Sequence, residues 1–129
     1  MKDKDAVVSA LKKLGVPAEL IQVAKPGEKL NLQGYYKSHT AKVDILVDKS
    51  YHNGYGPFGF SQEADGSYAV HVDDMDDKGA LARKTNTNQF STGVSQWYSA
   101  LKTQKALKKE GLSTNIKKDG NKLVVLAKG

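Results

Sequence analysis

Residues 58–72 read FGFSQEADGSYAVHV, and this stretch decides the fold class of the chain. Residues 58–60 and 68–72 show the two-residue apolar alternation of β-strands, and they flank Asp65-Gly66. Asp-Gly between two such runs is a strong hairpin signal, because both residues tolerate the positive φ of a tight turn. The alternation puts Phe58 and Phe60 on one face, which we assign to the interior.

Outward from this hairpin, three further segments have the pattern of strands. Val43, Ile45 and Val47 recur at every second position of residues 41–47, which predicts one strand there. Residues 20–23 and 30–33 flank a Lys-Pro-Gly-Glu turn and predict a second hairpin. Residues 116–126 predict a third hairpin, around Asp119-Gly120.

Two segments have the three- and four-residue apolar spacing of amphipathic helices, namely residues 4–14 and 89–110. Gly15 and Gly111 follow these segments and can supply the left-handed residue that ends a helix. On the second helix, Trp97 and Leu101 are expected to anchor the core. Residues 73–88 lack an apolar period and are predicted to form a surface loop.

These elements predict a single α+β domain over residues 1–129, with an antiparallel sheet built from consecutive hairpins and two helices packed on one face. Residues 10–16 resemble residues 106–112, and each copy is followed by Lys-x-Gly-x-Lys-Leu. Two interpretations stay open. The echo reflects either a helix-hairpin repeat with pseudo-twofold symmetry or the chance likeness of common residues at helix ends.

Composition excludes several classes of protein. The 129 residues contain no cysteine, so disulfides, thiolate nucleophiles and cysteine-ligated metals are excluded. No run of apolar residues is long enough to span a membrane, and the N-terminus mixes charges where a signal peptide would be apolar. We therefore expect a soluble cytoplasmic protein that does not bind membranes.

Charge is segregated along the chain. Residues 1–77 carry 9 Lys against 12 acidic residues, whereas residues 78–129 carry 11 Lys and Arg against 2 acidic residues, so a net −3 is followed by a net +9. Lys102, Lys105 and Lys109 form a stripe on the second helix, which is typical of a phosphate-backbone binder. A lysine-rich helix face is also common without any ligand, and the single arginine argues against specific base readout.

Candidate metal ligands lack the spacing of a known site. His39, His52 and His71 are isolated in sequence, and we expect structural or surface roles for them. Residues 73–77, DDMDD, offer carboxylates to a hard cation, but the glycine and terminal glutamate of a calcium loop are missing. A solvated acidic loop is the favoured interpretation. We expect neither a metal nor a cofactor.

Motifs of catalysis are likewise missing. Residues 54–59, GYGPFG, are rich in glycine, but Pro57 removes an amide and no helix is predicted to follow, so a phosphate-binding loop is not indicated. We expect that the protein is not an enzyme. Aromatic residues beside flexible glycines suit recognition, and with Phe58 and Phe60 assigned to the interior, Tyr51 and Tyr55 are the exposed candidates.

The order of several short motifs resembles a family of small uncharacterised proteins from cyanobacteria, red-algal plastids and cyanophages, known as a hypothetical chloroplast reading frame. The motifs are Gly34-Tyr35, AKVDI at 41–45, Gly59-Phe60, DGSY at 65–68, Asp73, Gln96-x-Tyr98, Lys102, Gly111 and Asp119-Gly120. The chain lacks the Ser/Thr-rich strand that precedes the first helix in that family, and the tryptophan that often follows the Asp73 position. The resemblance implies a divergent, phage-encoded member, and the family supplies no activity, cofactor or catalytic residue to carry over.

The sequence predicts a small cytoplasmic, non-enzymatic binding or regulatory protein that engages an acidic protein partner in a cyanobacterial or phage-infected cell. The alternative is non-specific nucleic-acid binding through the basic second helix and the C-terminal hairpin. The predicted partner-binding residues are Lys102, Lys105, Lys108, Lys109, Lys117, Lys118, Tyr51 and Tyr55.

Overall fold

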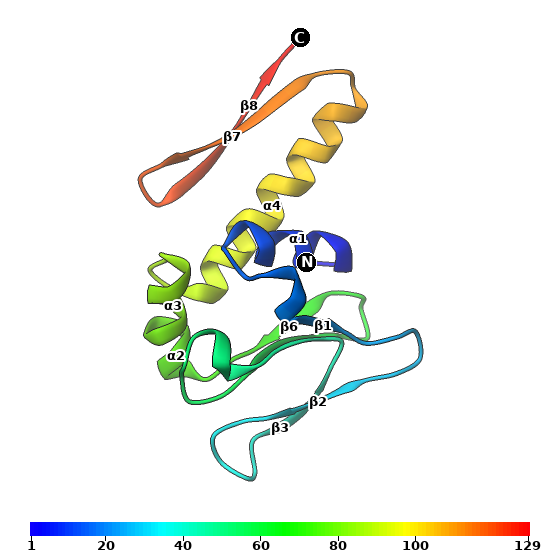
Figure 1. The fold of residues 1–129 in the computed structure, drawn as a ribbon. Helices are drawn as coiled ribbons and strands as arrows, with labels where there is room; N and C mark the ends of the chain where they lie inside the picture. The colour runs from blue at the N-terminus through cyan, green and yellow to red at the C-terminus, as the bar shows by residue number, and fades with distance from the viewer.

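A computed structural model describes residues 1–129, and it confirms the predicted α+β class (Figure 1). The helices are α1 (Lys4–Lys13), α2 (Asp74–Lys78), α3 (Ala80–Thr85) and α4 (Phe90–Lys109), with short 3₁₀ turns at Ala18–Leu20 and Lys49–Tyr51. None of these helices has the length and apolar character needed to cross a membrane.

The strands form three antiparallel sheets. They are β1 (Ile21–Val23), β2 (Leu30–Gln33), β3 (Thr40–Val43), β4 (Ile45–Val47), β5 (Phe58–Gln62), β6 (Tyr68–His71), β7 (Ser113–Asp119) and β8 (Lys122–Lys128). The four-stranded sheet has the order β1-β4-β5-β6, whereas β2-β3 and β7-β8 are separate two-stranded sheets. The predicted hairpins at 58–72 and 116–126 are therefore present as β5-β6 and β7-β8.

The main core lies between the four-stranded sheet and helices α1 and α4, which cover one of its faces (Figure 1). Phe58 and Phe60 are fully buried, as predicted, and Phe90 from α4 packs edge-on against Phe58 with ring centroids 4.7 Å apart. Trp97 and Leu101 lie at the margin of this cluster and are only partly buried. The three phenylalanines therefore fill the place that Trp97 and Leu101 were expected to fill.

Residues 41–47 form two strands rather than the single strand predicted. β3 pairs with β2, whereas β4 pairs with β1 and β5, so the chain passes from one sheet to another at Asp44. The Asp44 carboxylate accepts hydrogen bonds from the Gln62 backbone N–H at 2.7 Å and from Lys29 Nζ at 2.6 Å. Val43, Ile45 and Val47 are all buried. Their alternation therefore continues through the break.

The predicted hairpin over residues 20–33 is wrong. β1 and β2 do not pair with each other, because β1 joins β4 and β2 joins β3. Gly27 turns the chain between two sheets, with φ +80°. Only the second copy of the sequence echo, α4 followed by Gly111 and the β7-β8 hairpin, has the expected helix-hairpin form. The echo is therefore not a structural repeat.

Residues 73–88 are not a surface loop, because they contain α2 and α3. Asp73 caps α2 by accepting hydrogen bonds from the backbone N–H of Met75 and Asp76. Leu81 and Ala82 anchor α3 through burial. Each helix is at most six residues long, too short for an apolar period to be recognised in the sequence.

The C-terminal part of the chain stands away from the main core. We call residues 101–129, which comprise the second half of α4 and the β7-β8 hairpin, the arm, and residues 1–100 the body. The hairpin packs along α4 and projects beyond the body in Figure 1. None of the buried residues lies in the arm.

Candidate functional site

The Asp76 carboxylate is buried beneath the loop of residues 52–56. It is 1% exposed and accepts hydrogen bonds from the backbone N–H groups of Tyr55 at 3.0 Å and Gly56 at 3.1 Å. His52 Nε2 lies 3.4 Å from the same carboxylate. A Cβ at Gly54 would overlap the Asp76 side chain, so glycine is needed for this close approach. Asp76 therefore holds the loop from inside the protein.

Asp77 also points inward and serves as an acceptor for α4. It accepts hydrogen bonds from the Ser91 backbone N–H at 2.8 Å, from Ser91 Oγ at 2.9 Å and from Gln89 Nε2 at 2.7 Å. Ser91 is in the first turn of α4, where backbone N–H groups lack partners within the helix and a carboxylate is favourable. The expectation of a solvated acidic loop is therefore wrong, since Asp76 and Asp77 are structural.

Above the Asp76 anchor, three tyrosines form an exposed cluster. Tyr35 contacts Tyr36 and Tyr55 edge-on, with ring centroids 5.0 and 5.3 Å apart. Tyr35, Tyr36 and Tyr55 are 60%, 59% and 48% exposed. The first two tyrosines come from the β2-β3 connection, and Tyr55 comes from the loop that Asp76 holds. Residues distant in sequence thus present their rings together.

A shallow hollow of about 460 Å³ continues this cluster toward α2 and α3. Its lining includes Met75, which is 66% exposed, together with Lys49 and the only arginine of the chain, Arg83. We call the surface formed by Tyr35, Tyr36, Tyr55, Met75, Lys49 and Arg83 the aromatic face. It combines large exposed apolar groups with two cations.

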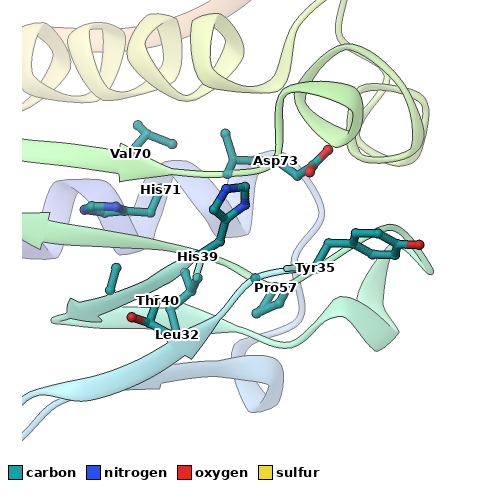
Figure 2. A pocket seen from close by; sticks show the side chains of 12 residues that line it. Leu32, Tyr35, His39, Thr40, Pro57, Val70, His71 and Asp73 are labelled. Carbon is teal, nitrogen blue, oxygen red and sulfur yellow. The ribbon is translucent and has the colours of Figure 1, made fainter. Parts of the chain in front are cut away.

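On the other side of Tyr35 lies a cavity of about 290 Å³ between the β2-β3 hairpin and the end of the β5-β6 hairpin. Figure 2 shows His39 near Asp73, while the His71 ring points away from the His39 ring. His71 Nε2 is instead 2.7 Å from Ser61 Oγ. No group of three potential metal ligands occurs in the structure. The cavity therefore has mixed polar and apolar walls, without a cluster of metal ligands.

The two tyrosines predicted to be exposed differ in their exposure to solvent. Tyr55 is exposed as expected and belongs to the aromatic face. Tyr51 is 8% exposed, so its assignment as an exposed recognition residue is wrong. Burial raises the pKa of the Tyr51 hydroxyl, and Lys84 Nζ lies 5.4 Å from the ring centroid. Tyr51 thus packs into the core, although it is four residues from Tyr55.

The predicted lysines are exposed but do not form one surface. Lys102 Nζ pairs with Asp3 Oδ2 at 3.2 Å and connects α4 to the start of α1. Lys105, Lys108 and Lys109 lie at the far end of α4, around Leu101 and Gln104. β7 then runs back along the helix, so Lys117 and Lys118 lie near the hairpin turn, where Gln96 contacts Asn121. Lys102, Lys105 and Lys109 thus keep their predicted spacing on α4, whereas Lys117 and Lys118 lie apart from them on β7.

Several residues of the aromatic face were missed in the sequence. Tyr35 and Tyr36 are adjacent aromatic residues in a polar segment, and this signal could have identified them. Met75 and Arg83 gave no comparable signal, because the helices that position them were not predicted. Their partnership depends on contacts between segments distant in the sequence.

Comparison with known proteins does not place the chain in a family. No protein-family model, curated protein sequence or solved structure matches it. The resemblance to the cyanobacterial and cyanophage family therefore stays a prediction, and the chemistry of the surface carries the functional argument.

Proposed function

We propose that this chain is a non-enzymatic binding module that engages an acidic partner protein through the aromatic face. The observation that carries the proposal is the contiguity of the exposed tyrosines with Met75 and Arg83. Tyrosine, methionine and arginine are enriched in protein interfaces, and a few such residues supply most of the binding energy. A contiguous exposed apolar surface of this kind marks an interaction site.

The face is supported from beneath, which favours binding. Asp76 fixes the backbone at Tyr55 and Gly56, and edge-on contacts hold the three tyrosines against one another. Tyrosine loses little conformational freedom when it is immobilised, because it has only two side-chain torsions. A preorganised surface of this type reduces the entropic cost of association.

The charges of the face favour an acidic partner. Lys49 and Arg83 line the hollow, and the single carboxylate among the lining residues, Asp76, is buried and already hydrogen-bonded. Complementary charge accelerates association and selects against basic partners. The resemblance described above is the reason for proposing a cyanobacterial or phage-infected cell as the setting of this interaction.

The proposal is tested by affinity capture from a cyanobacterial lysate with three tagged baits. The first is the parent chain, the second is the Tyr35→Ser, Tyr55→Ser, Arg83→Gln variant, and the third carries Val124→Ser and Leu126→Ser. The third bait is the control, because it removes exposed apolar side chains from the arm. A partner of the aromatic face should be retained by the parent and the control, and lost from the second bait.

Nuclease treatment and direct binding complete the test. The captured protein should survive nuclease digestion and should bind the purified parent chain with an affinity that falls as salt rises. Retention of the same proteins by all three baits would contradict the proposal. Capture that disappears after nuclease treatment would instead support the alternative of nucleic-acid binding.

A further inference from the structure

A second, polar groove lies on another part of the molecule, where the end of α1, the α3-α4 connection, the first half of α4 and the tip of the β7-β8 hairpin meet. Its volume is about 740 Å³, within the range of small-molecule sites. Lys13, Trp97 and Lys118 line it, together with several amide and hydroxyl side chains. None of its lining residues is acidic.

Specific contacts shape this groove. Gly93 lets the α3-α4 connection lie close to α4, because a Cβ at this position would meet Thr87 Cγ2 at 2.6 Å. Asn86 adopts a left-handed conformation with φ 54° and ends α3. The Gln96 side chain donates a hydrogen bond to the Asn121 carbonyl at 3.1 Å and thereby positions the hairpin tip. The walls are therefore built by four separate segments.

The groove presents three kinds of chemistry together. The side-chain amides of Asn86, Asn88 and Asn121 line it and form no hydrogen bonds within the protein. Lys13 and Lys118 contribute positive charge, and Lys13 Nζ lies 5.9 Å from the centroid of the Trp97 ring. Amides can hydrogen-bond base edges, lysines attract phosphates, and an aromatic ring stacks on a base.

We propose that this groove binds nucleotide units of single-stranded nucleic acid, with a base against Trp97 and phosphates at Lys13 and Lys118. This site is independent of the aromatic face and of Lys105, Lys108 and Lys109. A neutral sugar would use the amides and the ring, but it would gain little from two lysines in a groove without carboxylates. The combination therefore fits an aromatic base that carries a phosphate.

The chain offers a direct probe of this proposal, because Trp97 is its only tryptophan. A thymidine oligonucleotide of about 12 residues, close to the site size of small single-strand binders, is titrated into the full chain at low salt. We expect saturable quenching of the tryptophan emission. In a second experiment, thymidine monophosphate is titrated into the same chain. Quenching by both ligands supports recognition of a single nucleotide, and quenching by the strand alone supports a site that needs several phosphates.

Matched charge variants locate the site. Lys13→Gln with Lys118→Gln removes two positive charges from the groove, whereas Lys105→Gln with Lys109→Gln removes two from the far end of α4. All four side chains are exposed, so both variants should fold. The groove variant should bind the strand roughly tenfold more weakly, and the control should stay within about twofold of the parent. Equal weakening in both variants, or no quenching by either ligand, would overturn the proposal.

Discussion

The body and the arm are built from the same parts, a helix and antiparallel hairpins, but they differ in how those parts are stabilised. All 27 buried residues lie in the body, where α1 and α4 cover the four-stranded sheet. In the arm the β7-β8 hairpin packs mainly on α4, and even its apolar residues Val124 and Leu126 are 37% and 48% exposed. A region with so little burial opens more easily than a core.

The same contrast holds for charge. In the body, the carboxylates of Asp76 and Asp77 are buried and hydrogen-bonded to backbone N–H groups. In the arm, Lys105, Lys108 and Lys109 are exposed and form no ion pair. Charged residues therefore organise the body from within, whereas these three lysines determine only the surface potential of the arm.

The largest expected effect comes from truncating a core aromatic. Phe58→Ala should lower the free energy of unfolding by about 3–5 kcal/mol, because the side chain is fully buried between Phe60 and Phe90. Leu126→Ala, the matched truncation in the arm, should cost less than about 1 kcal/mol. Urea denaturation followed by circular dichroism measures both values. Equal costs would show that body and arm share one core.

A smaller loss is expected when the anchor of the 52–56 loop is removed. Asp76→Ala should cost about 2–3 kcal/mol, because the N–H groups of Tyr55 and Gly56 lose their acceptor. The control Asp74→Asn changes an exposed neighbour and should change stability by less than about 0.5 kcal/mol. Thermal unfolding compares the two variants. A neutral Asp76→Ala variant would contradict the structural role of this carboxylate.

The two Asp-Gly turns allow the same substitution to be compared in both regions. Gly66 in the body has φ +89° and Gly120 in the arm has φ +60°, so alanine should cost about 1–2 kcal/mol at either position. Gly66→Ala should lower the stability of the whole body. Gly120→Ala should accelerate amide hydrogen exchange only in β7 and β8. Faster exchange in β4 and β5 of the Gly120→Ala variant would show that the arm and the body unfold together.

The smallest expected effect is the contribution of Asp44 to the pH dependence of stability. Burial alone would raise the pKa of Asp44, but the hydrogen bonds from Lys29 and Gln62 outweigh it and hold the pKa below its usual value of 3.8. A lowered pKa in the folded state stabilises the protein above pH 3.8, and this stabilisation is lost as the pH falls through the folded-state pKa. When the pH is lowered from 5 through the folded-state pKa of Asp44, the free energy of unfolding should therefore fall less in the Asp44→Asn variant than in the parent. Parallel pH profiles of unfolding would contradict this assignment.

What could be predicted from the sequence depends on the range of the interactions. The Asp-Gly turns at 65–66 and 119–120 were identified because turn conformation is local. The break at Asp44 was not identified, since Val43 and Ile45 keep their alternation while they join different sheets. A periodicity shows which side chains are buried, but not which strand lies beside them.

The candidate site was predicted only in part for the same reason. Tyr51 and Tyr55 are only four residues apart, yet one is buried and the other exposed. Tyr51 packs into the core cluster, whereas the backbone of Tyr55 is held by Asp76, 21 residues later in the chain. Such a contact has no signature in composition or spacing. The exposed tyrosine was therefore found, whereas the surface around it was not.

The packing of α1 against α4 has a consequence for the order in which this protein can be completed on the ribosome. Backbone N–H groups of Lys2 and Asp3 donate to Tyr98 Oη, so the first helix is fixed by residues made nearly 100 positions later. Chains grow at about 5–20 residues per second. The segment between the end of α1 and the start of α4 therefore takes roughly 4–16 s to synthesise, and the apolar face of α1 lacks its α4 contacts during this time. During this interval Val7 and Leu11, which are fully buried in the finished protein, have no helix to cover them. Chaperone demand should therefore be greatest before translation reaches α4.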